Sequence, residues 1–159
     1  MNPVKLTPEG YDTLQKEYRE LKEVKLPEAV KRLEKARSMG DLKENSEYGA
    51  SKESLAFVDG RIQEIEEILR RAQVVKNQIN SNEVSLGSTV CVDCNGKPDT
   101  YCIVGEFEAD PLKRKLSHTS PIGTALIGKK VGDTVIVDVP AGKMKYTIVK
   151  IQQNPLKKT

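Results

Sequence analysis

The fold is decided at Gly40-Asp41-Leu42-Lys43-Glu44-Asn45-Ser46-Glu47-Tyr48, a stretch of nine residues that separates two long helical patterns. It has the length and composition of the turn of a helical hairpin. Within it Asp41 and Glu44 stand three residues apart, so a helix that begins here would carry both carboxylates on neighbouring positions. The stretch therefore predicts a hairpin whose turn exposes two acids.

Two interpretations of Asp41 and Glu44 are compatible with each other. Asp-x-x-Glu has the spacing of a capping box, in which Asp41 accepts a hydrogen bond from the amide of residue 44 and Glu44 bonds back to the helix start. A cap uses only some of the carboxylate oxygens, and the others could bind a divalent cation, which takes hard oxygen ligands readily. The spacing alone leaves both roles open.

The first helical pattern begins at about Pro8. Thr7 is a good N-cap, and Pro8 suits the first helical position because the N–H that it lacks would have no partner there. Pro27 is expected to kink the helix, and Ser38-Met39-Gly40 to end it, with Gly40 in the left-handed conformation. The apolar residues recur in steps of three and four, with a shift of about one residue near Pro27: Tyr11, Leu14, Tyr18 and Leu21, then Leu26, Val30, Leu33 and Ala36.

The second helix is predicted from about Leu42 to Ala72. Apart from Phe57 and Ile68, the positions outside its apolar seam are mostly charged, polar or Ala, so the two helices must pack mainly on each other. Together they predict an antiparallel coiled-coil hairpin. The seam again advances by three and four residues: Tyr48, Ser51, Leu55, Val58, Ile62, Ile65, Leu69 and Ala72.

Beyond the polar residues 77–86 the hydrophobic period changes from 3.5 to 2, which places a domain boundary there and predicts domains 1–78 and 79–159. Ser120-Pro121 predicts the start of a short helix over Ile122 to Ile127, closed by Gly128. The fold class is therefore α+β, a coiled-coil hairpin followed by a small antiparallel sheet with one short helix. Its predicted strands are 89–92, 100–104, 133–139 and 145–151, the last two joined by a tight turn at 140–143.

The composition limits the function. The 159 residues include 26 basic and 23 acidic ones, and the net charge of +3 is too small for a protein that holds nucleic acid by charge alone. No apolar run approaches the roughly 18 residues of a membrane span, and Met1-Asn2-Pro3-Val4-Lys5 does not begin a signal peptide. We expect a cytoplasmic protein that does not enter the membrane.

Three cysteines, Cys91, Cys94 and Cys102, raise the question of a zinc site. A closed structural site needs four nitrogen or sulfur ligands, and His118 is the one plausible fourth ligand. Reduced, half-buried thiols on strands are the interpretation that we favour for a cytosolic chain.

The turn motif, together with Glu108-Ala109-Asp110-Pro111, Ser120-Pro121-Ile122-Gly123 and Leu126-Ile127-Gly128-Lys129, closely resembles the GreA transcript cleavage factors of bacterial RNA polymerase. The resemblance covers nearly the whole chain. It implies a coiled coil that enters the secondary channel of the polymerase and a C-terminal domain of FKBP-like fold that holds the channel rim. The three cysteines are not part of the family pattern.

The resemblance also assigns roles to residues. Asp41 and Glu44 match the two tip acids, with Gly40, Leu42, Lys43, Asn45 and Tyr48 supporting them, and Ser120, Pro121, Ile122 and Gly123 match a segment of the rim-binding domain. Two carboxylates are too few to hold Mg²⁺ alone, because that ion wants octahedral oxygen ligands. The isolated protein, expected to be a monomer, would bind no metal. Joined to a polymerase site that already holds one Mg²⁺, the two acids would ligate a second and promote hydrolysis of the backtracked RNA 3′ segment, which the protein contacts only indirectly.

Three alternatives remain. A module of the same architecture could modulate or inhibit the polymerase by plugging the channel without cleavage, but a plug has no need of metal ligands at its tip. Prolyl isomerase activity would need an aromatic-lined pocket, and residues 79–159 hold only Tyr101, Phe107 and Tyr146 as aromatics. Direct binding of single-stranded RNA would need stacking aromatics along a basic groove, and neither feature is apparent. For Arg37, Lys43 and Lys52 near the turn, a solvated helix face is the default interpretation.

Overall fold

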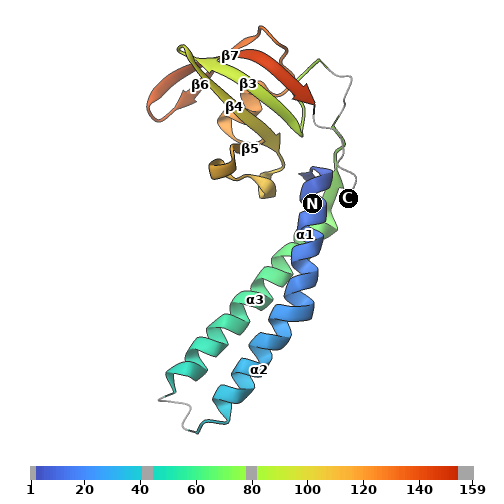
Figure 1. Ribbon diagram of the computed structural model, residues 1–159, viewed down its shortest axis with the longest axis vertical. Helices are drawn as coiled ribbons and strands as arrows, with labels where there is room; N and C mark the ends of the chain where they lie inside the picture. The colour runs from blue at the N-terminus through green and yellow to red at the C-terminus, as the bar shows by residue number, and fades with distance from the viewer. Residues whose placement is uncertain (1–2, 41–44, 78–81, 154–159) are drawn as a thin grey trace. The chain divides into compact units, whose positions relative to one another are not determined.

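The computed structural model describes residues 3–40, 45–77 and 82–153, which fall into two compact units (Figure 1). Asp12–Arg71 form the hairpin unit, and Met1–Tyr11 with Ala72–Thr159 form the sheet unit. The first residues join the sheet unit because strand β1 (Val4–Leu6) pairs in parallel with β2 (Ala72–Val74). The predicted domains 1–78 and 79–159 concern which parts fold alone, and they stay a prediction.

The first helical segment starts where its capping residues predict. Helix α1 (Pro8–Glu20) begins after Thr7, whose Oγ1 accepts a hydrogen bond from the Gly10 N–H at 3.1 Å. A second acceptor lies beside this cap: the Glu108 carboxylate accepts bonds from the N–H of Thr7 (2.8 Å), the hydroxyl of Thr7 and the N–H of Gly105 (3.0 Å). A Cβ on Gly10 would lie 2.0 Å from the Glu108 Oε1, so only glycine fits there without a shift of Glu108. Glu108 thus ties the first turn of α1 to the sheet unit.

A π turn, Leu21–Lys25, separates α1 from α2 (Leu26–Arg37). The Leu26 N–H donates to the Leu21 carbonyl five residues back, so this turn holds one residue more than an α-helical turn would. The extra residue accounts for the shift of the seam by one residue near Pro27. The irregularity lies in the turn before Pro27, which occupies the first turn of α2.

The seam of the first segment differs at one position from the prediction. Val30 is 36% exposed, whereas Ala29 is buried. After the π turn the seam continues as Leu26, Ala29, Leu33 and Ala36, in steps of three, four and three. The expectation for Val30 was wrong, because the seam advances by three residues from Leu26 to Ala29 and not by four.

Helix α3 (Ser46–Arg71) lies antiparallel beside α2 (Figure 1). Its centre is buried as predicted at Ile62 and Ile65, and Ile68 is buried as well. The helix begins at Ser46, after the predicted start at about Leu42, and it ends at Arg71, one residue before the predicted end. Asn45 is already non-helical and caps the start at Ser46, while Ala72 is drawn into β2 by its pairing with Val4.

Polar contacts between the helices reinforce the seam. The Arg61 guanidinium donates two hydrogen bonds to Glu17, at 2.8 and 3.0 Å, and the Tyr18 hydroxyl donates to Glu66 at 2.7 Å. Exposed ion pairs contribute about 0–1 kcal/mol each, whereas one fully buried Leu or Ile contributes about 1.5–3 kcal/mol. The apolar seam therefore supplies most of the hairpin's stability.

The sheet unit contains five further strands in the order β5-β4-β3-β7-β6. Their bounds are β3 (Ser88–Cys94), β4 (Lys97–Val104), β5 (Lys115–Ser117), β6 (Thr134–Val139) and β7 (Gly142–Gln153). The β3–β4 hairpin turns at Asn95 and Gly96, which have φ angles of 53° and 83°, as a two-residue turn with positive φ requires.

The expected antiparallel sheet has one parallel edge. Strand β5 pairs with β4 in parallel, with Leu116 opposite Ile103, so the sheet is mixed. Two short 3₁₀ helices, Glu106–Glu108 and Pro111–Lys113, carry the chain back along β4 before β5 begins. Three residues are too few to show a period in the sequence, which is why β5 was not predicted.

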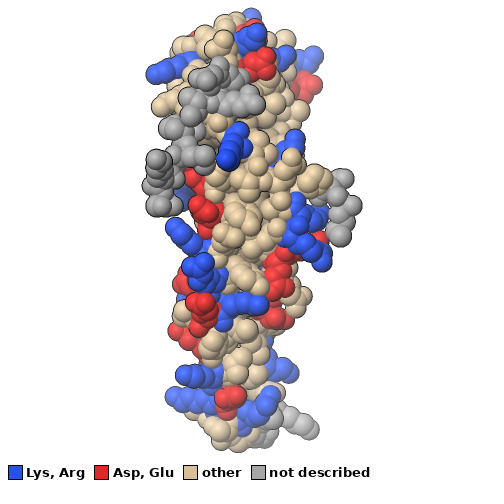
Figure 2. All heavy atoms as spheres, turned by 90° about the vertical axis from the view of Figure 1, so that its right-hand side faces the viewer, with Lys and Arg blue, Asp and Glu red and all other residues tan. Residues whose placement is uncertain are grey.

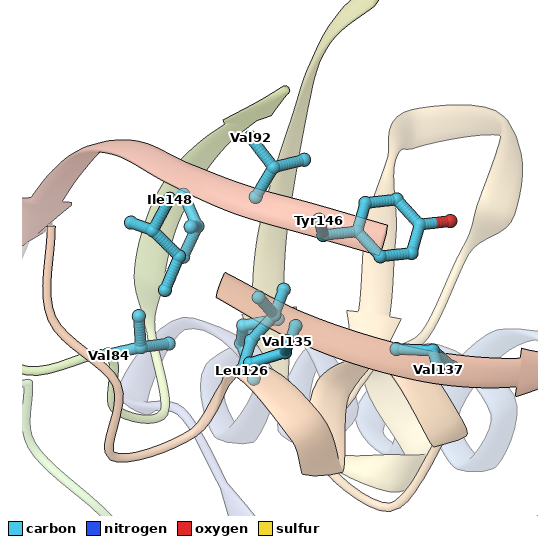
Figure 3. Close-up of a cluster of buried hydrophobic side chains, with 9 residues drawn as sticks. Val84, Val92, Leu126, Val135, Val137, Tyr146 and Ile148 are labelled. Carbon is cyan, nitrogen blue, oxygen red and sulfur yellow. The ribbon is translucent and has the colours of Figure 1, made fainter. Parts of the chain in front are cut away.

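The core of the sheet unit lies between the sheet and helix α4 (Pro121–Leu126), the predicted short helix (Figure 3). Alternate residues of three strands face it, and Leu126 of α4 is fully buried against them. The buried cluster consists of Val84, Val90, Val92, Ile103, Leu126, Val135, Val137, Tyr146 and Ile148.

Candidate functional site at the hairpin turn

The two sides of the turn are well defined by the residues that flank it. Helix α2 ends at Arg37, Ser38 is its C-cap, and Gly40 has a φ of +107°, the conformation predicted for it. The four residues that follow, Asp41, Leu42, Lys43 and Glu44, lie outside the described residues. The roles that the resemblance implies for them stay predictions.

Asn45 closes the turn with both ends of its side-chain amide. Its Oδ1 accepts a hydrogen bond from the Tyr48 N–H at 3.2 Å, which makes Asn45 the N-cap of α3. Its Nδ2 donates to the Ala36 carbonyl at 2.8 Å, in the last turn of α2. One side chain therefore caps one helix and bonds to the end of the other.

This cap bears on the capping-box interpretation of Asp41 and Glu44. A capping box joins the N-cap to the third residue of the helix. In α3 those positions are Asn45 and Tyr48, because the helix begins at Ser46. The N-cap and third positions of α3 are therefore occupied by Asn45 and Tyr48, not by the Asp-x-x-Glu pair.

A second contact joins the helices next to the turn. The Arg32 Nε and Nη2 atoms donate to the two carboxylate oxygens of Glu47, at 2.6 and 3.2 Å. The hydrogen bond and the charge of Arg32 hold the pKa of Glu47 below its ordinary value and raise that of Arg32. This paired geometry, two parallel N–H···O bonds, is the more specific form of a salt bridge.

Tyr48 and Ser51 complete the first turns of α3. Ser51 is fully buried, and its Oγ donates to the Tyr48 carbonyl at 2.8 Å. The Lys52 ammonium lies 5.3 Å from the centre of the Tyr48 ring. Tyr48, which the resemblance places among the tip-supporting residues, is thus half-buried beneath Lys52.

A basic hollow of about 430 Å³ lies beside the Arg32–Glu47 pair, lined by Lys31, Arg32, Lys35, Ala36, Met39 and Glu47. Figure 2 shows blue Lys and Arg side chains gathered at this end of the hairpin. Farther from the turn, basic and acidic side chains alternate. The net charge of the chain is small, but the lining of this hollow carries three basic side chains and one acidic side chain.

The second predicted segment, Ser120-Pro121-Ile122-Gly123, forms the start of α4. The Ser120 Oγ accepts from the Gly123 N–H at 3.1 Å and donates to the Ser117 carbonyl at 2.7 Å. A Cβ on Gly123 would lie 2.1 Å from the Ser117 carbonyl oxygen, so the backbone contact requires glycine. Ser120 and Gly123 have local structural roles, while Pro121 is exposed.

The three cysteines are half-buried thiols on strands, as predicted. Cys91 and Cys94 lie on β3 and Cys102 on β4, and burial raises the pKa of the Cys102 thiol. Across residues 3–40, 45–77 and 82–153, no group of three or more His, Cys, Asp or Glu side chains is arranged to hold a metal ion. None of the helices in that part of the chain is long and apolar enough to cross a membrane.

Two of these contacts went unnoticed in the sequence. The sequence did offer a signal for Asn45, because Asn is as good an N-cap as Asp. The Asp-x-x-Glu spacing instead favoured Asp41 as the N-cap. Arg32 and Glu47 stand 15 residues apart on different helices, and no helical spacing links them. Only the packing of α2 against α3 brings that pair together.

A helical hairpin whose turn carries two acids in its sequence and a small mixed sheet make up the two units of this chain. Residues 4–74 match the family described as transcription elongation factor, N-terminal, and residues 79–153 match the family described as transcription elongation factor, GreA/GreB, C-terminal. The chain belongs to the GreA/GreB family of transcription elongation factors.

Two GreA factors are similar to the chain over most of its length. The chain is 49% identical over 149 residues to transcription elongation factor GreA of Lactococcus lactis subsp. cremoris, covering 92% of this chain and 96% of the relative. It is 47% identical over 148 residues to GreA of Bacillus subtilis, with 92% and 94% covered. The crystal structure of GreA factor homolog 1 of Thermus thermophilus is 35% identical, covers 95% of this chain and 99% of that chain, and gives a TM-score of 0.45.

Proposed function

We propose that this elongation factor binds bacterial RNA polymerase, places its hairpin in the secondary channel and stimulates endonucleolytic cleavage of the backtracked RNA 3′ end. The polymerase is the enzyme in this proposal, and the hairpin turn supplies Asp41 and Glu44 as ligands. Arrested complexes are thereby returned to elongation. The nascent RNA is reached only through the polymerase active centre.

The observation that carries the proposal is the identity of the α3 cap. Asn45 satisfies the Tyr48 N–H, so the N-cap position of α3 is filled by Asn45 and not by Asp41. In this proposal the two acids, which precede the capping residue, serve as ligands. The family assignment supplies the context in which such ligation is useful.

The donor set fits Mg²⁺ only as a shared site. Two carboxylates supply fewer oxygens than an octahedral ion requires, so the isolated protein has too few ligands and the remainder would come from the polymerase. When held in that joint site, the ion would help to activate a water and stabilise the leaving oxygen. Asp41 and Glu44 contribute charge and oxygen ligands, and the hairpin contributes their placement.

The sheet unit is assigned the holding role. The resemblance implies an FKBP-like fold for it and a contact with the channel rim through Ser120-Pro121-Ile122-Gly123. Pro121 is the exposed residue of that segment that precedes the half-buried Ile122, so it is the residue that we expect to touch the polymerase first. With one factor per polymerase channel, the protein would act as a monomer.

The decisive experiment uses a stalled elongation complex with labelled RNA. Asp41→Asn and Glu44→Gln should each abolish stimulated cleavage while polymerase binding stays close to the parent's, because both changes keep shape and weaken metal ligation. Raised Mg²⁺ should partly restore cleavage. Glu53→Gln, which neutralises an exposed acid farther along α3, is the matched control and should cleave as the parent does. Parent-level cleavage by both acid variants in limiting Mg²⁺ would refute the metal role.

The same assay separates the alternative functions. A parent protein that binds the polymerase and slows elongation without shortening the RNA would be a channel-plugging modulator.

Prolyl isomerase activity, which needs its own assay, has one observation in its favour: Tyr101 and Tyr146 line a common hollow of about 340 Å³ with Met144 and Pro98. The Tyr101 hydroxyl is already bonded to Asp99 at 2.8 Å, and we expect no turnover of a proline peptide above background.

A further inference from the structure

The two ends of the hairpin turn are joined by hydrogen bonds of the Asn45 side chain. Asn45 donates to the Ala36 carbonyl at 2.8 Å and accepts from the Tyr48 N–H at 3.2 Å. Ala36 is 1% exposed, so this bond lies in the seam between the helices. The bond therefore joins the end of α2 to the residue immediately before α3.

The bond also meets a need of α2. The last carbonyls of a helix have no partner within it. The Ala36 carbonyl accepts from the Met39 N–H at 3.2 Å and from Asn45, so it serves both the C-terminal turn of α2 and the bridge. A cap alone would need only the Oδ1 of Asn45, whereas the bridge needs the Nδ2 as well.

The Arg32–Glu47 pair is the second tie. Arg32 lies one helical turn before Ala36, and Glu47 lies two residues after Asn45. Their side chains are 45% and 46% exposed, so the pair adds little to the stability of the chain. Its two parallel hydrogen bonds, at 2.6 and 3.2 Å, nevertheless set the position of one helix against the other close to the turn.

These ties bear on the acids by covalent connection. Only four residues join Gly40 to Asn45, so whatever fixes α2 and Asn45 also fixes both ends of the stretch that carries Asp41 and Glu44. Two ligands that must meet one ion tolerate little error, because a displacement of about 1 Å can cost on the order of a hundredfold in rate.

We propose that Asn45, supported by the Arg32–Glu47 pair, is a positioning residue that sets the separation of the two ends of the turn and thereby aims Asp41 and Glu44. This inference rests on the proposed cleavage function. Asn45 itself does not touch the ion or the RNA in this assignment. Its contribution lies in the bond to Ala36, beyond the cap that it provides to α3.

Three variants separate the bridge from the cap. Asn45→Ser keeps a good N-cap acceptor but cannot reach across as the longer amide does, Asn45→Ala loses both bonds, and Ser46→Ala alters the neighbouring exposed residue as a control. We expect Asn45→Ser to melt within a degree or so of the parent, yet to lose about tenfold in cleavage and to need more Mg²⁺ for half-maximal rate. A residue that only caps would give parent-like cleavage and an unchanged Mg²⁺ requirement in Asn45→Ser.

The second tie is tested by exchanging its charges. Arg32→Glu and Glu47→Arg should each raise the Mg²⁺ requirement, and the double exchange should restore it, because only the double variant pairs opposite charges again. Parent and Asp41→Asn are measured alongside. If the parent stimulates no cleavage, the proposed function is wrong. If the parent cleaves and Asp41→Asn does not, but Asn45→Ser and both charge variants match the parent, the positioning inference alone is refuted.

Discussion

At the scale of single residues, Glu108 has a structural role in one of the motifs that carry the family resemblance. It lies in Glu108-Ala109-Asp110-Pro111, and its carboxylate accepts from the Thr7 N–H, the Thr7 hydroxyl and the Gly105 N–H. Asp110 of the same motif caps the next 3₁₀ helix, because its Oδ1 accepts from the Leu112 N–H at 3.2 Å. The motif therefore orders the loop that receives the first turn of α1.

His118 gives the sheet unit a pH dependence with a definite sign. Burial, followed by the charge of Lys5, lowers the pKa of His118, and the charges of Glu106 and Glu108 oppose that shift. The unfolded chain, with an ordinary histidine pKa of about 6.5, thus takes up a proton at a higher pH than the folded chain does. The free energy of unfolding should fall as the pH drops through that value.

The measurement is the urea midpoint at pH 7.5 and at pH 5.5, for the parent and for His118→Gln. His118 is the one histidine of the chain, and the carboxyl groups with lowered pKa, Glu47, Glu66 and Asp99, act at more acidic pH. The parent should lose more stability than the variant over this window. An equal loss in both proteins would contradict the assignment to His118.

At the scale of elements, the π turn leads us to a prediction that would not apply to a regular α-helix. The seam runs Leu14, Tyr18, Leu21 and then, five residues on, Leu26. Deleting the exposed Val24 should shorten that gap to four, restore regular steps and leave the hairpin folded, because the π turn becomes an α-helical turn.

Deletion of Lys31 from α2 is the matched control. It removes an exposed residue outside the π turn and rotates all following side chains by about 100° relative to the preceding seam. Leu33 and Ala36 would leave the seam, and the half-buried leucine would lose part of the roughly 1.5–3 kcal/mol that full burial contributes. Thermal melting followed by circular dichroism compares the two deletions. If the Val24 deletion is as destabilising as that of Lys31, the π turn does not account for the seam shift.

At the scale of the whole molecule, the two compact units and the predicted domains lead to different expectations for the stability of fragments 1–78 and 79–159. Fragment 1–78 should be strongly helical, because it contains the complete hairpin. Fragment 79–159 lacks Thr7, the main partner of Glu108, and it also lacks β1 and β2. We expect it to fold with a lower melting temperature than the sheet unit has in the full chain, by the equivalent of about 1–3 kcal/mol.

Glu108→Gln in the full chain is the companion measurement. It replaces one acceptor oxygen by a donor, and it should move the melting of the sheet unit toward that of fragment 79–159. Glu106→Gln, which changes an exposed neighbour in the same turn, should leave the melting unchanged. A fragment 79–159 as stable as the full-length sheet unit would show that the first residues add nothing to it.

The sequence by itself determined the features that depend on neighbouring residues. The start of α1 at Pro8, the left-handed Gly40, the four main strands and the short helix after Ser120 all follow from caps, turn residues and hydrophobic period. The acid pair Asp41 and Glu44 and the family resemblance could also be recognised from the sequence. The π turn is also visible in the sequence, as a shift of the seam by one residue. The sequence suggested that the shift lies at Pro27, whereas it lies in the turn before that residue.

The tertiary structure alone decided which distant residues meet. Val4 pairs with Ala72, Thr7 with Glu108, Arg32 with Glu47 and Ala36 with Asn45, and the parallel edge strand β5 joins β4. The physical reason is common to all of them. A cap or a period is set within one turn of chain, whereas these contacts form only after the hairpin seam and the sheet core have brought separate segments together, and their residue types carry no record of the partner.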